Sequence, residues 1–228
     1  MSDGLAAVQP DGPVYRLGRS PDPWAWPDWS YASTDGTFGN RWDDPAGSYR
    51  VLYACSQRAG AFVETLSRFR PDLEVIAALA DIEGEEDDLP QGVVPQRWLE
   101  GRLIGEAIVH GRFADVGEAR SLATLRRELA SRAIHYGLSD LDAAVIRLTA
   151  PRAFTQEVSR FVYEWRDAEG AFAGIRYRSR LGDQFLNWAI FEPPSEAASP
   201  VGEPASKTIE SDDPDLAEAL GLLGLKLG

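Results

Sequence analysis

The chain has 228 residues, of which 23 are Lys or Arg and 36 are Asp or Glu, so its formal net charge at pH 7 is −13. This balance disfavours direct contact with nucleic acid or anionic membranes, because both depend on Lys and Arg near phosphate groups. No stretch approaches the roughly 20 apolar residues that span a bilayer. The first residues lack the basic start and apolar core of a signal peptide, so we expect a cytoplasmic protein. The single cysteine, Cys55, excludes an intramolecular disulfide.

The first fifty residues predict little regular structure. Residues 1–12 are small and polar, and we expect them to be disordered. The next segment carries four tryptophans, Trp24, Trp26, Trp29 and Trp42, among prolines that forbid a regular helix. We interpret it as an irregular segment packed on the core, although its tryptophans could instead form the wall of a pocket.

Regular elements are predicted from residue 51 onwards. Residues 51–54 form a short apolar run typical of a strand, and Ser56 can cap a helix that ends at Pro71. A second strand is predicted over 73–79. The acidic run at 81–88 is interpreted as a solvated loop.

The middle of the chain is predicted to be mainly helical. We expect one helix within 96–113 and another over 116–136, where apolar residues repeat at helical spacing. Residues 143–148 are predicted to form a strand. A further helix is expected to begin with Thr155 as its cap, because apolar residues follow it at helical spacing.

The C-terminal part predicts two strands, a linker and a helix. The strands cover 174–179 and 188–191, and residues 195–213 are rich in Ser, Pro, Glu and Asp, as linkers are. A short apolar helix is expected to begin at Pro214 with Asp213 as its cap. Because strands and helices do not alternate regularly, the predicted fold class is α+β.

Common catalytic motifs are absent from the sequence. The two histidines, His110 and His135, fall in predicted helices, and with one cysteine they predict no metal site. No Walker motif, dinucleotide fingerprint or GxSxG motif occurs.

Three segments carry a more specific pattern. Residues 38–47 read FGNRWDDPAG. Residues 51–56 read VLYACS, followed by AFVE at 61–64. Residues 174–180 read GIRYRSR, followed by NWAIF at 187–191. In this order and spacing, the three segments resemble the RES domain family, and the resemblance covers most of the chain.

The resemblance implies a fold and an activity. The fold would be similar to that of ADP-ribosyltransferases, with a mixed, largely antiparallel central sheet and flanking helices. The catalytic domain would span 13–194, followed over 195–228 by the acidic linker and the apolar helix. RES proteins cleave the nicotinamide–ribose bond of NAD by phosphorolysis or hydrolysis. NAD would then be the substrate, inorganic phosphate a co-substrate, and no further cofactor or metal would be needed.

The resemblance also implies roles for five residues. Arg41, Glu64 and Ser179 match the Arg, Glu and Ser for which the family is named, Tyr53 matches a strand aromatic, and Arg16 matches an N-terminal arginine. Arg41 and Arg16 would bind the phosphates, and Tyr53 would lie against the nicotinamide. Glu64 would stabilise positive charge on the ribose, and Ser179 would position the nicotinamide amide or a ribose oxygen.

Each of these residues also has a purely structural interpretation. Arg41 could pair with a nearby carboxylate, Glu64 with Arg68 one helical turn later, and Arg16 could form a surface ion pair. Tyr53 could be a core tyrosine, and Ser179 a turn serine. Tyr177 and Arg180 are weaker candidates, and Asn187 is interpreted as a hydrogen-bonding residue at the end of a strand.

Two departures from the family pattern motivate a non-catalytic binding module as one alternative. Asp43 stands where the family has Asn, and Arg178 where Pro is usual. The alternatives are ADP-ribosyl transfer to a macromolecule and a non-catalytic binding module. The resemblance implies an Xre-like antitoxin as partner. The apolar stretch from Leu216 to Leu227 could bind such a partner, form a homodimer or pack on its own domain.

Overall fold

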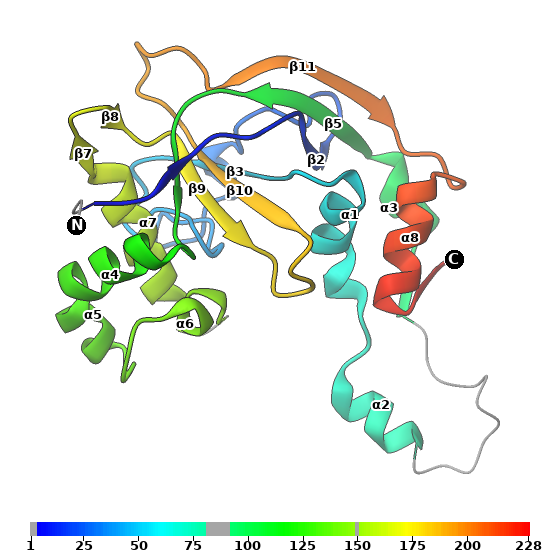
Figure 1. Ribbon diagram of the computed structural model, residues 1–228. Helices are drawn as coiled ribbons and strands as arrows, with labels where there is room; N and C mark the ends of the chain where they lie inside the picture. The colour runs from blue at the N-terminus through cyan, green and yellow to red at the C-terminus, as the bar shows by residue number, and fades with distance from the viewer. Residues whose placement is uncertain (1–3, 81–91, 149–150) are drawn as a thin grey trace.

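A curled central sheet organises the computed structural model, which describes residues 4–80, 92–148 and 151–228 (Figure 1). Within these residues the sheet has eight strands in the order β1-β6-β9-β10-β3-β2-β5-β11. Neighbouring strands are antiparallel except β6 and β9, which are parallel. The strands are β1 (Ala7–Val8), β2 (Val14–Arg19), β3 (Val51–Cys55), β5 (Arg102–Val109), β6 (Phe113–Asp115), β9 (Gly174–Arg178), β10 (Leu186–Phe191) and β11 (Val201–Thr208). The predicted α+β class is confirmed.

Two small sheets and a set of helices complete the fold. β4 (Gly92–Val94) pairs with β12 (Leu225–Leu227), and β7 (Arg166–Asp167) pairs with β8 (Gly170–Ala171). The α-helices are α1 (Arg58–Leu66), α2 (Leu73–Ala80), α3 (Gln96–Glu100), α4 (Ala119–Glu128), α5 (Ala130–His135), α6 (Ala143–Arg147), α7 (Arg152–Glu164) and α8 (Pro214–Leu223). Two short 3₁₀ helices, η1 (Trp29–Tyr31) and η2 (Ser67–Phe69), lie in the connections.

The helices form two groups at the two ends of the sheet. In Figure 1, α4 to α7 lie on one side, α1 and α8 lie together on the other, and α2 projects away from the body. Phe154, Val158 and Val162 of α7 are buried in a core with strands β9 and β10. A second core joins Phe62 of α1 to Leu216 of α8.

The C-terminal helix follows its predicted capping pattern. Asp213 is the N-cap of α8, and its Oδ1 accepts hydrogen bonds from the backbone N–H groups of Asp215 and Leu216 at 3.0 and 3.3 Å. Arg58 of α1 forms ion pairs with Asp213 and Asp215. The apolar C-terminal stretch therefore packs on its own domain, one of the three outcomes left open by the sequence.

The region expected to be a linker contains a strand of the main sheet. β11 pairs along β5, with an irregularity between Gly202 and Ala205, where Glu203 has a φ of 49°. Its polar, Pro-containing sequence is typical of an edge strand, because one hydrogen-bonding edge of such a strand faces solvent. Composition alone does not separate such a strand from a linker. The boundary expected at residue 194 therefore divides the central sheet.

The N-terminal residues described by the structure are also ordered by the sheet. We expected residues 1–12 to be disordered, but β1 pairs with β6. The backbone N–H of Ala6 donates to Ser121 Oγ at 2.9 Å, and Thr124 Oγ1 donates to the carbonyl of Gly4 at 2.9 Å. Both partners lie on α4, more than a hundred residues away. Distant partners of this kind leave no local pattern.

Two predicted strands are helices. Residues 73–79 lie in α2, where Asp72 Oδ1 accepts from the backbone N–H of Glu74 at 2.9 Å and alanines supply high helix propensity. Residues 143–147 form α6, where Asp142 Oδ1 caps the backbone N–H of Val145 at 2.9 Å. Short apolar runs fit a buried strand and a buried helix equally well, and in both segments the preceding aspartate favours the helix.

Three expected helices have different boundaries. Only Gln96–Glu100 of the segment 96–113 is helical among these described residues, and β5 follows because β2 and β11 pair with its two edges. The helix predicted over 116–136 is divided at Leu129 into α4 and α5. Helix α7 begins at Arg152, so Thr155 lies inside its first turn and does not cap it. The acidic run at 81–88 lies outside the described residues.

Candidate functional site

A cavity of about 460 Å³ lies where strands β2 and β3 meet the helix α1. The two strands are paired at one position, Tyr15 opposite Cys55, and both line the cavity. Four of the five residues singled out by the sequence, Arg16, Arg41, Tyr53 and Glu64, also line it. The fold thus brings together residues from two strands, one helix and one loop.

Arg41 presents unused hydrogen-bond donors in this cavity. Its guanidinium carbon lies 5.1 Å from the ring centroid of Trp42 and 5.5 Å from that of Tyr177. Its Nε and Nη2 atoms are buried and have no hydrogen-bond partner among the described residues. Burial lowers the pKa of Arg41, while the nearby Glu64 acts in the opposite direction. Buried donors without partners are costly, so this arrangement is prepared for a ligand that accepts hydrogen bonds.

Tyr53 and Asp43 hold the loop that carries Arg41. The Tyr53 hydroxyl donates to Asp43 Oδ1 at 2.8 Å and accepts from the backbone N–H of Trp42 at 3.0 Å. Asp43 Oδ2 accepts from the backbone N–H of Asn40 at 2.6 Å. Burial raises the pKa of Asp43 and also that of Tyr53, on which the Asp43 charge acts in the same direction. The aspartate that departs from the family pattern is therefore integrated in the loop.

Helix α7 supports the same loop from its outer side. Arg152 Nη1 donates to the carbonyl of Gly39 at 2.6 Å, and Gln156 Nε2 donates to that of Asn40 at 3.0 Å. Ser159 Oγ donates to the carbonyl of Trp42 at 2.6 Å. These bonds occupy consecutive turns of one helix, so the backbone around Arg41 is fixed on both sides.

Glu64 is oriented by a neighbour on the central strand. Asn187 Nδ2 donates to Glu64 Oε1 at 2.6 Å. On β10, Asn187 lies opposite Cys55 of β3 and opposite Tyr177 of β9, so the three side chains project from one face of the sheet. All three line the cavity. The Asn187 amide leaves the second carboxylate oxygen of Glu64 available to a ligand.

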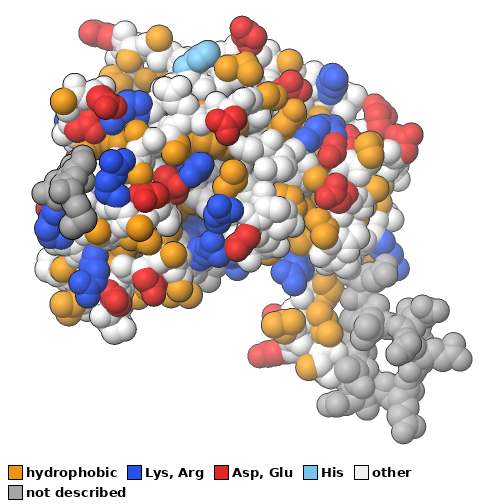
Figure 2. Space-filling view, viewed as in Figure 1, with side chains coloured by type: hydrophobic (Ala, Val, Ile, Leu, Met, Phe, Trp, Pro, Cys, Tyr) orange, Lys and Arg blue, Asp and Glu red, His pale blue; other side chains and the backbone are white. Residues whose placement is uncertain are grey.

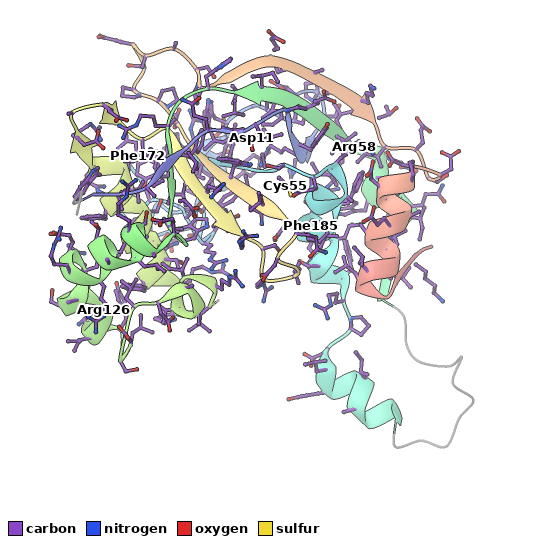
Figure 3. All side chains as sticks on the ribbon, in the orientation of Figure 1. Asp11, Cys55, Arg58, Arg126, Phe172 and Phe185 are labelled. Atoms are coloured by element: carbon purple, nitrogen blue, oxygen red, sulfur yellow. The ribbon has the colours of Figure 1, made fainter. Side chains whose placement is uncertain are left out.

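Cys55 and Gly60 explain how closely α1 approaches the sheet. Figure 3 shows Cys55 and Phe185 near each other beside α1. A Cβ atom at Gly60 would lie 2.4 Å from Cys55 Sγ and 2.8 Å from Phe185 Cδ1, so a larger residue would push the helix outwards. Burial raises the pKa of the Cys55 thiol to about 12, which keeps it protonated at neutral pH.

Arg16 bridges the two diverging strands. Its Nε donates to the carbonyl of Pro23 at 2.8 Å, and its Nη1 donates to the carbonyl of Tyr53 at 3.0 Å. Burial lowers the pKa of Arg16 to about 10, so the side chain remains charged at neutral pH. Because its acceptors are neutral carbonyl groups, its positive charge remains uncompensated and contributes to the field in the cavity.

Ser179 lies outside the residues that line the cavity. It is buried in the β9–β10 connection, where its Oγ accepts from the backbone N–H of Leu181 at 2.9 Å and its own N–H donates to the carbonyl of Phe185 at 2.9 Å. The structure therefore places Ser179 as a turn residue. Two nearby residues of the same segment, Tyr177 and Arg180, do line the cavity. They are the weaker candidates from the sequence.

Several residues of the cavity are not predicted as site residues from the sequence. Asn187 is the first residue of the NWAIF segment, and its place in that segment is the sequence feature that indicates a role in the site. Asn40 and Cys55 adjoin Arg41 and Tyr53, respectively, within recognised segments. Arg152 lies on α7, and nothing in its local sequence indicates that this helix packs against the Arg41 loop. These omissions concern contacts between distant segments.

The cavity is strongly basic in an acidic protein. Five arginines, Arg16, Arg41, Arg68, Arg152 and Arg180, line it together with one carboxylate, that of Glu64. On the face shown in Figure 2, Lys and Arg side chains gather at the lower edge of the body, where the outline is hollowed. Among the described residues, no cluster of His, Cys, Asp and Glu is arranged to hold a metal ion. The local charge suits an anionic organic ligand.

Comparisons with known proteins show a similarity to one protein family over part of the chain. The family model of the RES domain matches residues 13–100, which include Arg16, Arg41, Tyr53 and Glu64. The contributions of β9 and β10 to the cavity lie beyond the matched region. Neither the curated proteins nor the solved structures compared with the chain give a match. None of the described helices has the length and apolar character needed to cross a membrane.

Proposed function

We propose that this protein, whose residues 13–100 belong to the RES domain family, binds NAD in the cavity and cleaves its nicotinamide–ribose bond. The observation that carries the proposal is the Arg41 guanidinium, whose buried Nε and Nη2 have no partner among the described residues and which lies near the carboxylate of Glu64. A dinucleotide offers both an anion for the arginine and a ribosyl group for the carboxylate.

The arginines account for binding. A guanidinium group donates two parallel hydrogen bonds to a phosphate, and Arg41 has two donors free for this purpose. Arg180 and Arg152 lie on the same cavity and are exposed, so they can neutralise the second charge of the pyrophosphate. Tyr53 uses its hydroxyl within the loop, which leaves its ring as the part able to contact the nicotinamide.

Glu64 accounts for the acceleration of bond cleavage. The bond between the ribosyl C1′ and the nicotinamide nitrogen breaks, and its electron pair leaves with the nicotinamide, which thereby becomes neutral. Positive charge develops on the ribosyl group, and a carboxylate close to it stabilises the transition state. The Asn187 amide donates a hydrogen bond to one oxygen of Glu64 and so fixes the side-chain conformation. The other oxygen can then face the ribose.

The nucleophile completes the reaction at C1′. An oxygen of inorganic phosphate would give ADP-ribose-1″-phosphate. Water would give ADP-ribose and release one proton. The proposal includes the cytoplasm as the place of action and an Xre-like antitoxin as partner, both of which rest on the family resemblance.

Product analysis tests the proposal directly. Purified protein is incubated with NAD in phosphate buffer and in phosphate-free buffer, and the products are identified by mass spectrometry. We expect nicotinamide together with ADP-ribose-1″-phosphate or ADP-ribose. Absence of nicotinamide release in both buffers would refute the proposal, and label from NAD on a macromolecule would show ADP-ribosyl transfer instead.

A variant of Glu64 tests its role in this reaction. Glu64→Gln keeps an acceptor for Asn187 but removes the charge, so kcat should fall by about 100-fold, as for the loss of one preorganised electrostatic group. Glu218→Gln on the exposed face of α8 is the matched control and should retain full activity. Unchanged turnover in Glu64→Gln would remove Glu64 from the mechanism.

A further inference from the structure

A group of three arginines, Arg19, Arg68 and Arg102, lies beside the cavity and has no role in the mechanism above. Arg68 lines the cavity and follows Glu64 by four residues, which corresponds to roughly 6 Å along a helix axis. Its guanidinium carbon lies 5.4 Å from the ring centroids of both Phe69 and Trp98. Through the Trp98 ring, Arg68 therefore connects the cavity with Arg102.

The sheet register places two of these arginines directly opposite each other. Arg19 of β2 is paired with Arg102 of β5. Directly opposed residues of an antiparallel pair project from the same face, and like charges in this position are destabilising. Because side chains alternate along a strand, Arg19 shares its face with Leu17, which lines the cavity. An unfavourable pair at this position needs a compensating negative charge.

Trp98 holds Arg102 close to Arg68. The Arg102 guanidinium carbon lies 3.9 Å from the centroid of the Trp98 ring, and its Nη1 donates to the Trp98 carbonyl at 2.7 Å. The aromatic ring thus contacts both guanidinium groups. Arginines that stack on a ring keep their outward N–H groups available for an anion.

No carboxylate of the described residues neutralises this group. The ion pairs recorded there involve other arginines, although the protein carries a net charge of −13. Burial lowers the pKa of Arg102, and the positive charges of Arg68 and Arg19 lower it further. Three uncompensated cations at the edge of a cavity indicate a subsite for a strongly charged anion.

We propose that Arg19, Arg68 and Arg102 form a subsite for a phosphate monoester, occupied by the 2′-phosphate of NADP. The proposal rests on the proposed function, because it places a dinucleotide in the cavity with its pyrophosphate at Arg41. A phosphate monoester carries nearly two negative charges at neutral pH, which matches several guanidinium groups better than one. The 2′-phosphate is the additional anion that distinguishes NADP from NAD.

Calorimetry tests the subsite without turnover. The full chain is titrated with adenosine 2′,5′-bisphosphate, with 5′-AMP and with inorganic phosphate. We expect the bisphosphate to bind about tenfold more tightly than 5′-AMP, as for one added charge-assisted contact, and Arg68→Gln to remove this difference. Arg70→Gln, which changes an exposed arginine two residues away, is the matched control and should keep it.

Kinetics extends the test to the reaction. The ratio of kcat/KM for NADP to that for NAD should fall about tenfold in Arg68→Gln and in Arg102→Gln and remain unchanged in Arg70→Gln. Equal affinity for bisphosphate and 5′-AMP in the unaltered protein would overturn the subsite. Inorganic phosphate could also bind as tightly as the bisphosphate and lose as much affinity in Arg68→Gln. That result would overturn the assignment of the subsite to the 2′-phosphate. Binding of the bisphosphate without cleavage of either dinucleotide would refute the proposed function and leave the subsite supported.

Discussion

The Tyr53 hydroxyl holds the loop that carries Arg41. It donates to Asp43 Oδ1 and accepts from the backbone N–H of Trp42, so Tyr53→Phe removes two hydrogen bonds by deleting one oxygen atom. The aromatic ring, and with it any contact to the nicotinamide, is kept. The substitution therefore separates the loop-holding role of Tyr53 from a role in contacting the substrate.

The expected loss of stability follows from the groups left without partners. Trp42 and Asp43 are buried, with 0% and 3% of their surface exposed. An unpaired buried polar group costs about 1–3 kcal/mol. With some relief from water that enters the adjacent cavity, we expect the free energy of unfolding to fall by about 2–4 kcal/mol. In a protein of this size that lowers Tm by roughly 5–15 °C.

Two measurements check this prediction. Urea unfolding followed by tryptophan fluorescence gives the free energy of unfolding, and NAD cleavage gives kcat and KM. Tyr53→Phe should raise KM, because the Arg41 loop is less well held. Tyr31→Phe changes an exposed tyrosine, whose surface is 66% exposed, and should alter neither quantity. A loss of stability below about 0.5 kcal/mol in Tyr53→Phe would show that these bonds do not hold the loop.

Two further predictions concern Asn187 and Asp213. Asn187→Asp replaces the amide that donates to Glu64 Oε1 with a second carboxyl group, so repulsion between the two groups should displace Glu64 and lower kcat; an unchanged kcat would mean that Asn187 does not act through Glu64. Asp213→Asn keeps the helix cap but removes the charge paired with Arg58, whose hydrogen bond lowers the pKa of Asp213. A carboxyl group whose pKa is lowered by folding stabilises the folded state at pH values above its pKa in the unfolded chain. This stabilisation is lost as the pH falls through its pKa in the folded state. Urea unfolding should therefore show Asp213→Asn destabilised at pH 7 and equal to the unaltered protein near pH 2, and a difference that does not change with pH would contradict the assignment.

Local patterns in the sequence were sufficient where a cap or a buried strand determines the structure. Asp213 and Pro214 begin α8 as predicted, and the run from Trp188 to Phe191 lies in the buried strand β10. The family pattern identified Arg16, Arg41, Tyr53 and Glu64, which the structure places on one cavity. Composition and motif spacing are properties of contiguous residues, and they succeed for that reason.

Predictions failed where partners distant in sequence decide the conformation. β5 contains Gly105 and charged residues and was taken for a helix, but β2 and β11 complete its hydrogen bonds on both edges. The composition of residues 195–213 predicts a linker, but pairing with β5 makes residues 201–208 the strand β11. Propensity differences are small compared with the hydrogen bonds supplied by neighbouring strands.

The candidate site shows the same limit. Asn187 was interpreted as a residue that ends a strand, because its bond to Glu64 joins residues 123 positions apart. Ser179 was predicted as a site residue through the family pattern, whereas its described contacts are those of a turn. A family pattern identifies positions, and only the packing of α1 against β10 shows which side chains meet.

The pairing of β3 with β10 has a consequence for the order of events during synthesis. The matched family region ends at residue 100, but β3 acquires its pairing with β10, which runs from Val51 to Cys55, only when β10 has left the ribosome. Such long-range pairing gives a high contact order and slow folding. Glu64 would therefore lack its Asn187 partner on any chain shorter than 187 residues. The cavity would therefore be complete only after β10 has joined the sheet.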